Sequence, residues 1–137
     1  NLPVIIHSRE AMQETYDILK VSNVYGVMHC YSGSIEMAKA FTKIGFLLGI
    51  GGVLTFKNSK LKDVVKEIDL QYLLSETDAP YLTPEPYRGK LNYPKYTRLV
   101  VEEIARIKKM YFDDVCMILF NNAQNIFKLK EVKNEKS

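Results

Sequence analysis

Hydrophobic residues along the chain gather in four short runs, at positions 4–6, 25–28, 46–50 and 72–74. Within each run they follow one another without alternating with polar residues. Such continuous runs are typical of strands buried on both faces, as in a parallel β-sheet. The spacing between the runs leaves room for one helix after each strand, which is the size of a βα unit. We therefore predict an α/β fold with about four parallel strands.

The segments between and after these runs have the hydrophobic spacing of amphipathic helices. The predicted helices are 9–20, 35–43, 61–68 and 95–110. Ser34 is the expected N-cap of the second helix, and Gly45 is expected to end it. A last helix runs to the NNAQNIF segment at 121–127, and Asp113 or Asp114 is expected to cap its start.

The fourth run ends at two carboxylates, Glu76 and Asp78, and then enters a loop rich in proline. Four of the five prolines lie in or just after this loop, at positions 80, 84, 86 and 94. Proline cannot donate a hydrogen bond to a neighbouring strand and disfavours helix in the residue before it. The strand is therefore expected to end near Asp78, which places this carboxylate where α/β proteins hold their active sites.

The two histidines of the chain occupy equivalent positions, since His7 closes the first run and His29 closes the second. In a parallel sheet the carboxyl ends of the strands open onto one face, so His7, His29 and Asp78 can converge. Two imidazoles and a carboxylate suit zinc or a similar divalent ion. Taken singly, a histidine at a strand end is more often a hydrogen-bonded core residue. The repeated position of the histidines favours the metal site.

Composition and charge narrow the class of protein. A length of 137 residues allows one domain with a sizeable core. The net charge of +3 is compatible with an anionic ligand but far from the basic coat of many nucleic-acid-binding proteins. No apolar run approaches the roughly 20 residues of a membrane helix, so we expect no membrane association. Isolated Cys30 and Cys116 suit a reducing compartment, and we expect a cytoplasmic protein, with a nuclear or organellar location also open.

Longer motifs surround the candidate ligands. They read PVIIHSREA at 3–11, GVMHCYSGS at 26–34 and ETDAPYLTPEPYRGKLNYP at 76–94. In these motifs and in NNAQNIF the sequence resembles the TatD-type metal-dependent deoxyribonucleases of the amidohydrolase superfamily. The resemblance covers almost the whole chain except its tail. It implies a (β/α)8 barrel that hydrolyses phosphodiester bonds in DNA with one or two divalent ions, such as zinc, magnesium or manganese.

The resemblance also implies roles for individual residues. His7 and His29 would be metal ligands on the fifth and sixth strands of the barrel. Asp78 would be the metal ligand and proton acceptor on the eighth strand. Tyr31 stands where the family usually has phenylalanine.

The sequence departs from the family in what it lacks. The family places a His-x-His pair on its first strand and a glutamate on its fourth, and this sequence contains neither strand. Since a whole barrel needs about 250 residues, we predict the C-terminal half of a (β/α)8 TIM-type barrel, with helices on its outer face. We assign residues 1–128 to this partial hydrolase domain and 129–137 to a charged tail. Without the other ligands the chain is expected to be inactive alone.

Cationic side chains near the strand ends are the expected substrate ligands, because the DNA backbone is anionic. Arg9 follows the first run, and Arg88 and Lys90 lie in the proline-rich loop; the planar guanidinium of arginine suits phosphate oxygens. Asn92 either binds substrate or caps the following helix. Glu76 is either a hydrogen-bond partner of a metal-bound histidine or a purely structural residue.

Other residues near the motifs have simpler expected roles. Cys30 follows a candidate ligand, so we expect it to point to the opposite face as a buried, inert thiol. The tyrosines of the loop could stack on nucleotide bases, although packing of the loop onto the barrel is the more ordinary role. They are at positions 81, 87, 93 and 96.

Three function classes remain open from the sequence. The first is a metal-dependent phosphodiesterase with DNA as substrate, which the RGK segment at 88–90 favours. The second is an amidohydrolase-type enzyme that cleaves a small amide or ester, favoured if Arg9 and Arg88 point away from the metal. The third is a non-catalytic half-barrel fragment. Its two unpaired edges and uncovered inner face would then associate with a second copy or with the missing N-terminal half.

Overall fold

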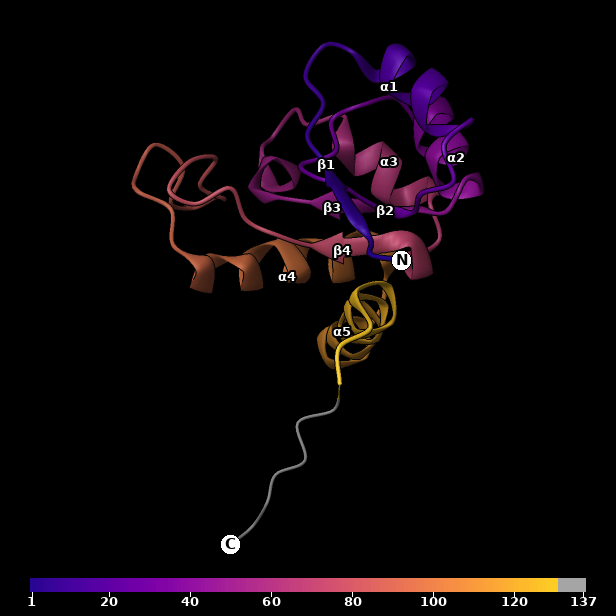
Figure 1. Cartoon of the computed structure of the whole chain (residues 1–137). Coiled ribbons are helices and arrows are strands. Elements are labelled where there is room, and N and C mark those ends of the chain that lie inside the picture. The colour runs from indigo at the N-terminus through magenta and orange to yellow at the C-terminus, as the bar shows by residue number, and fades with distance from the viewer. Residues whose placement is uncertain (131–137) are drawn as a thin grey trace, which may run out of the picture.

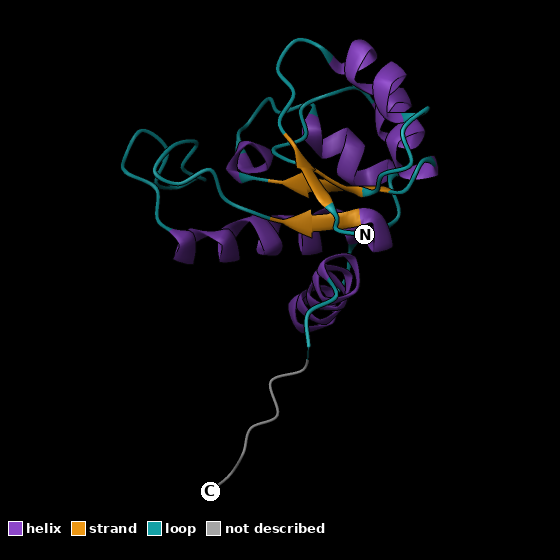
Figure 2. Cartoon of the chain, viewed as in Figure 1, coloured by secondary structure: helices purple, strands orange, loops and turns teal. Residues whose placement is uncertain are grey.

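A computed structural model describes residues 1–130 and shows a parallel sheet with helices packed around it (Figures 1 and 2). The strands are β1 (Val4–Ile6), β2 (Gly26–Met28), β3 (Phe46–Ile50) and β4 (Leu73–Ser75). They lie in the order β1-β2-β3-β4, and all three pairings are parallel. All carboxyl ends therefore lie at one end of the sheet. This confirms the predicted α/β fold.

Helices α1 (Met12–Leu19), α2 (Ile35–Lys43) and α3 (Leu61–Glu67) connect the strands, α4 (Thr97–Lys108) and α5 (Phe112–Phe127) follow the last strand, and consecutive helices pack on one another. The 3-10 turns of residues 1–130 are η1 (Gly52–Thr55), η2 (Leu70–Tyr72) and η3 (Pro94–Tyr96). Within residues 1–130, no helix combines the length and the apolar character needed to cross a membrane.

The hydrophobic core lies between the sheet and the helices. Phe46, Leu48 and Ile50 alternate along β3 and are fully buried against this layer. Phe41 of α2 is equally buried, and it meets the ring of Tyr16 edge-on at a centroid distance of 5.7 Å. Burial of each such side chain contributes roughly 1.5–3 kcal/mol, so the sheet and its helices form one packed unit.

The opposite face of the sheet carries the side chains that alternate with the core residues along each strand. Ile5, Val27 and Leu47 are aligned by the strand register. Val4 and Ile6 pack toward the core, whereas Ile5 between them is 63% exposed. The face that would line the interior of a closed barrel is therefore partly open at β1.

Several helix boundaries differ from the sequence-based prediction by one to three residues, since α3 ends at Glu67 and α4 spans Thr97–Lys108. The first helix begins at Met12, not residue 9, because Glu10 adopts a left-handed backbone with φ of 54° that a helix cannot include. The predicted aspartate cap of α5 is wrong. Tyr111 occupies the N-cap, and Asp113 and Asp114 lie in the first turn, where they suit the helix dipole.

The second predicted helix agrees with the structure at both ends. Ser34 caps α2, since its hydroxyl accepts a hydrogen bond from the backbone N–H of Met37 at 3.1 Å. Gly45 follows the helix with φ of 93°, a conformation that glycine adopts without strain. The chain therefore turns directly from α2 into β3.

The last helix ties the fourth strand into place. Asn122 donates hydrogen bonds to the backbone carbonyls of Leu70 and Leu73, both at 2.9 Å. These carbonyls flank the start of β4, so the NNAQNIF segment fixes the strand that leads to Asp78. Of the predicted tail at 129–137, residues 131–137 lie outside the described part of the chain.

Candidate metal centre

A cavity of about 550 Å³ opens at the carboxyl ends of the strands. His7 enters it from the end of β1, His29 from the end of β2 and Asp78 from the loop after β4. The two imidazole rings lie with their centroids 6.2 Å apart. The structure thus brings together the three side chains predicted to converge. Their role as metal ligands stays a prediction.

Strand register explains why these side chains meet. Ile5 and Val27 are paired in register, and His7 and His29 each follow two residues later. Because side chains alternate along a strand, residues two apart lie on the same face. Both imidazoles therefore emerge from the face opposite the core.

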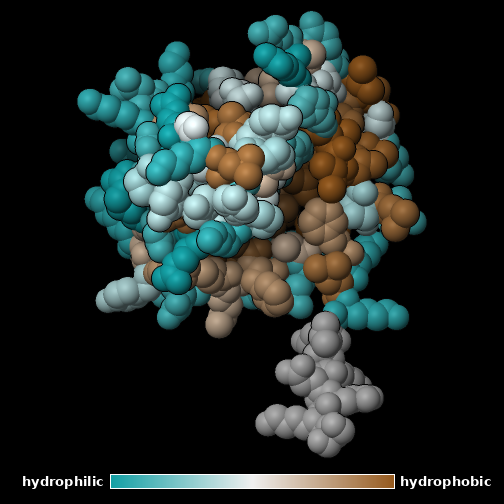
Figure 3. Space-filling model, turned by 90° about the vertical axis from the view of Figure 1, so that its left-hand side faces the viewer, coloured by the Kyte–Doolittle hydropathy of each residue, from teal (hydrophilic) through white to brown (hydrophobic). Residues whose placement is uncertain are grey.

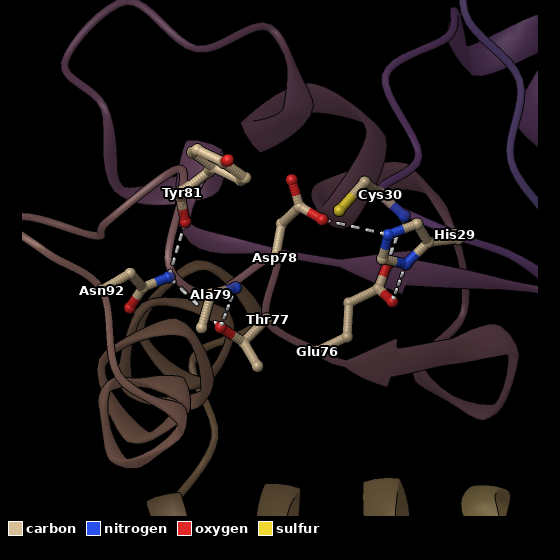
Figure 4. A network of polar contacts seen from close by, with 8 residues as sticks. All are labelled: His29, Cys30, Glu76, Thr77, Asp78, Ala79, Tyr81 and Asn92. Atoms are coloured by element: carbon tan, nitrogen blue, oxygen red, sulfur yellow. Dashed lines mark hydrogen bonds and ion pairs between the residues drawn. The ribbon is translucent and has the colours of Figure 1, made fainter.

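Glu76 holds the ring of His29 in a fixed orientation. Its Oε2 accepts a hydrogen bond from Nδ1 of His29 at 2.6 Å, and its Oε1 accepts one from the backbone N–H of Cys30 (Figure 4). With the proton on Nδ1, the lone pair of Nε2 is directed to the other side of the ring. There it faces Oδ1 of Asp78 at 3.4 Å. The contact with His29 fits the first role open for Glu76 from the sequence, and the bond to the backbone of Cys30 fits the structural role, so both stay predictions.

Gly49 makes room for this carboxylate. A Cβ at that position would lie 2.1 Å from Oε1 of Glu76 and 2.5 Å from its Cδ. No other residue type leaves the carboxylate where it now lies. Gly49 therefore allows Glu76 to take the position from which it orients His29.

The facing atoms of His29 and Asp78 fit a bound cation. An imidazole lone pair and a carboxylate oxygen are both acceptors, so a proton or a metal ion between them is favourable. Partial burial lowers the pKa of His29, but the hydrogen bonds and negative charges of Glu76 and then Asp78 outweigh it, so this pKa is raised. The electrostatics of the site thus favour positive charge at the point where the three predicted ligands meet.

The predicted substrate ligands do not all lie at this cavity. Arg9 lines it. The guanidinium of Arg88 instead lies 3.7 Å from the centroid of the Phe56 ring, in a neighbouring hollow. Lys90 is exposed, and its backbone carbonyl accepts a hydrogen bond from Thr83. The structure therefore brings one of the three cations to the candidate ligands.

Asn92 is built into the proline-rich loop. Its side chain is 5% exposed, and its Nδ2 donates to Oγ1 of Thr77 at 3.2 Å and to the carbonyl of Tyr81 at 2.8 Å. Asn92 caps neither η3 nor α4, because Tyr93 is the N-cap of η3 and Tyr96 is the N-cap of α4. The capping role is wrong. The substrate-binding role stays a prediction, and what the structure shows is a residue that ties the loop together beside Asp78.

Lys60 is a cation of the cavity that sequence reasoning missed. It lines the wall formed by the segment after β3, together with Ser59 and Leu61. Its position after a strand, at the same end as the histidines, is the signal that could have found it. Arg9 and Lys60 thus supply positive charge from two different loops.

Comparison with protein families identifies the chain. The model of the TatD related DNase family matches residues 1–128. The chain belongs to this family.

Relatives of known sequence agree with the assignment. The uncharacterized metal-dependent hydrolase YabD of Bacillus subtilis is 47% identical over 133 residues, covering 94% of this chain and 52% of its own. The uncharacterized metal-dependent hydrolase YcfH of Escherichia coli is 37% identical and covers 93% and 49%. The chain therefore spans about half the length of these curated relatives.

Solved structures show the same relation in three dimensions. The crystal structure of YjjV, a TatD homologue from Escherichia coli, superimposes with a TM-score of 0.88 at 32% identity, over 93% of this chain and 51% of that one. A TatD family hydrolase from Entamoeba histolytica shares the fold with a TM-score of 0.80 at 20% identity. The chain thus matches part of a TatD barrel, as the sequence predicts.

Tyr31, at a position where the resemblance implies phenylalanine, packs in the core with its hydroxyl satisfied. The residue is buried, and its hydroxyl donates to the carbonyl of Ser34 at 2.5 Å. Its ring meets Phe41 edge-on at 6.4 Å. The extra hydroxyl is therefore hydrogen-bonded, and the aromatic packing beneath the cavity is kept.

The loop tyrosines pack mostly on one another. Tyr87 stacks on Tyr96 at a centroid distance of 4.5 Å, and Tyr93 meets Tyr96 edge-on at 5.8 Å. Tyr81 differs, since it is 69% exposed and lines the cavity. Figure 3 looks onto the side of the molecule from which this loop projects; hydrophilic residues cover much of it, and hydrophobic residues are exposed at its right.

Cys30 does not point away from the site, and that expectation is wrong. Its φ of 46° interrupts the alternation of the strand, so the side chain lines the cavity. Ligand atoms of His29, Cys30 and Glu76 lie within 4.8 Å of one another. Burial, followed by the negative charges of Glu76 and Asp78, raises the pKa of Cys30 to about 12. The thiol is therefore expected to be inert, although it faces the site.

We expect metal-free protein to show this inertness directly. In a Cys116→Ser variant, iodoacetamide at pH 8 should modify Cys30 roughly a hundredfold more slowly than the same chain unfolded in urea, because the thiolate is the reactive form. Mass spectrometry of timed samples measures both rates, and EDTA keeps the site free of metal. Equal rates in the folded and unfolded chains would contradict the raised pKa.

Proposed function

We propose that the protein hydrolyses phosphodiester bonds in DNA, using a metal-activated water, in a form that has the length of its relatives. The observation that carries the proposal is the alignment of Glu76, His29 and Asp78, with His7 at the same cavity. The family assignment supports a metal-dependent hydrolase. The cations at the cavity support an anionic substrate.

His7, His29 and Asp78 would hold the metal. A bound zinc, magnesium or manganese ion would polarise a phosphoryl oxygen and lower the pKa of a water molecule. Asp78 would orient the attacking water and accept its proton as the new oxygen–phosphorus bond forms. Glu76 keeps the Nε2 lone pair of His29 directed at the site. Arg9 and Lys60 would bind the non-bridging oxygens of the phosphate. The bond from phosphorus to the leaving oxygen would break with its electron pair on that oxygen, which takes up a proton from solvent.

A second candidate is hydrolysis of a small amide or ester with the same ligands. The specific observation in its favour is the position of Arg88, which contacts Phe56 and does not line the cavity. Arg9 and Lys60 favour phosphate, since both line the cavity and neither forms an ion pair within residues 1–130. We therefore rank the phosphodiesterase first.

The part of the relatives that this chain does not match, about half of their length, is a candidate partner for the chain. β1 and β4 end the four-stranded sheet, and Ile5 is exposed on its inner face. We propose that the other half of the barrel covers these surfaces and adds further metal ligands. A second copy of the chain is the alternative occupant, and a fragment without catalytic activity is then expected.

One comparison tests the function. A full-length form, meaning a protein of the relatives' length that contains residues 1–137, is stripped of metal and reloaded with zinc, magnesium or manganese. Bis(p-nitrophenyl) phosphate, a DNA oligonucleotide, p-nitrophenyl acetate and a small anilide are then offered separately. We expect metal-dependent cleavage of the two phosphodiesters, and little or no turnover by residues 1–137 alone.

Other results would change the assignment. Metal-dependent cleavage of the acetate or anilide, with both phosphodiesters intact, would replace the proposal by the second candidate. Strong phosphodiester cleavage by residues 1–137 alone would show that the remaining half is not needed. Size-exclusion chromatography of the same samples separates pairing with the other half from self-association.

A further inference from the structure

A second, shallower hollow lies beside the cavity, and the chemistry described so far does not use it. Its volume is about 310 Å³, and its wall includes Phe56, Lys57 and Arg88. Val53 and Ser59 line both this hollow and the cavity. The two depressions therefore share a wall and follow one another along the surface.

The hollow is positively charged. Within residues 1–130, neither Lys57 nor Arg88 forms an ion pair with a carboxylate. Their charges are thus available to a ligand. With Arg9 and Lys60 at the cavity, they extend the positive surface from the candidate metal centre into the hollow.

Arg88 is held over this hollow. Its guanidinium carbon lies 3.7 Å from the centroid of the Phe56 ring, a cation–π contact of roughly 0.5–1 kcal/mol at an exposed site. The backbone of its loop is pinned on either side, by the Tyr87–Tyr96 stack and by the hydrogen bond from Thr83 to the carbonyl of Lys90. A guanidinium fixed in this way loses little freedom when it binds an anion.

A polynucleotide presents one phosphate per nucleotide, so a strand with one phosphate at the cavity brings the next phosphate to a neighbouring position. We propose that the hollow is a subsite for the phosphate adjacent to the scissile one, with Lys57 and Arg88 as its ligands. This inference rests on the proposed phosphodiesterase function. It gives Arg88 a role in substrate binding away from the metal, and it makes the preferred substrate a strand longer than one nucleotide.

Length-dependent binding tests the subsite. Fluorescence anisotropy measures the affinity of residues 1–137 for fluorescein-labelled thymidine mononucleotide and for the labelled tetranucleotide. The variants are Lys57→Ala with Arg88→Ala, and Lys57→Ala alone. The matched control is Lys39→Ala with Arg98→Ala, which removes the same charge from exposed positions on α2 and α4.

We expect the wild-type chain to bind the tetranucleotide more tightly than the mononucleotide. The Lys57/Arg88 variant should bind the tetranucleotide about tenfold more weakly, with a slope against log salt that is shallower by about 0.7 for each phosphate that the protein no longer neutralises. Mononucleotide affinity and the control variant should be unchanged. Lys57→Ala alone leaves the packing of the loop as it is, and it should give part of the same reduction in affinity.

Equal affinity of the wild type for both lengths would overturn the subsite, and so would an equal loss of affinity in the control variant. A full-length assay separates this failure from failure of the function. Bis(p-nitrophenyl) phosphate has no second phosphate, so the Lys57/Arg88 variant should hydrolyse it at the wild-type rate while its KM for DNA rises. If no phosphodiester is hydrolysed at all, the proposed function fails. If DNA cleavage is intact and unaffected by the substitutions, the subsite alone fails.

Discussion

Asp78→Asn is expected to reduce kcat of the full-length form on DNA by about a thousandfold or more, because it removes a metal ligand and the proton acceptor together. The substitution keeps the shape of the side chain and removes its charge. Asp78 lies in the loop after β4, its carboxylate is partly exposed, and its Oδ1 faces Nε2 of His29 at 3.4 Å. Folding should therefore change little while kcat falls. Steady-state kinetics and metal analysis of the purified variant measure the effect.

Asp63→Asn is the matched control for this experiment. Asp63 is an exposed residue of α3 that does not line the cavity, and the substitution removes the same charge. Its kcat should equal that of the wild type. If the Asp78→Asn variant cleaved DNA at the wild-type rate, Asp78 would have no role in the reaction. Weaker metal binding with retained slow turnover would show that it acts as a ligand only.

Much of the site follows from the sequence because it depends on strand register. The runs at 4–6 and 46–50 are strands with the predicted bounds. Once β1 and β2 are parallel and adjacent, His7 and His29 must emerge side by side, whatever the loops do. The convergence of the histidines is thus a property of backbone topology, which hydrophobic runs specify well.

The parts that could not be predicted depend on single backbone angles and on loop packing. Glu10 and Cys30 adopt positive φ, and each breaks a periodicity that sequence reasoning extends. For Cys30 this turns the thiol into the cavity; for Glu10 it delays the first helix and leaves Arg9 in the loop beside the site. The charge of Arg88 predicts a substrate ligand beside the strand ends, yet its guanidinium lies against the ring of Phe56, in the segment that follows η1. Such contacts are set by tertiary structure, which residue types alone do not specify.

The role of Glu76 illustrates the same limit. The sequence shows a carboxylate two residues before Asp78, and this spacing fits an orienting residue and a structural residue equally well. Only the geometry shows that its two oxygens bind different groups, the imidazole of His29 and the backbone of Cys30. Gly49 could not be linked to it from the sequence, because the close approach joins two different strands, β3 and the end of β4.

Gly49→Ala should therefore weaken metal binding without unfolding the protein. The new methyl group would meet the end of the Glu76 side chain, which can rotate away at little cost, and no backbone atom is among the closest contacts. Rotation would break the 2.6 Å contact with Nδ1 of His29 and release the orientation of its ring. Removal of such a partner typically lowers metal affinity about 10–100-fold. Zinc titration of residues 1–137 against a competing chelator measures the change, with circular dichroism to follow folding.

Two further variants test whether the loss of metal affinity comes from the displaced Glu76 carboxylate. Gly51→Ala adds the same methyl group two residues later, where the nearest atom, Sγ of Cys30, is 3.8 Å away and φ of −108° suits alanine; its metal affinity should be unchanged. Glu76→Gln keeps the bulk of the side chain but removes the charge that stabilises the Nδ1 proton, and it should reproduce most of the reduction. If Gly49→Ala bound zinc as tightly as the wild type, the orientation of His29 by Glu76 would have no part in metal binding. If Gly51→Ala weakened binding equally, the effect would lie in the strand backbone and not in the carboxylate.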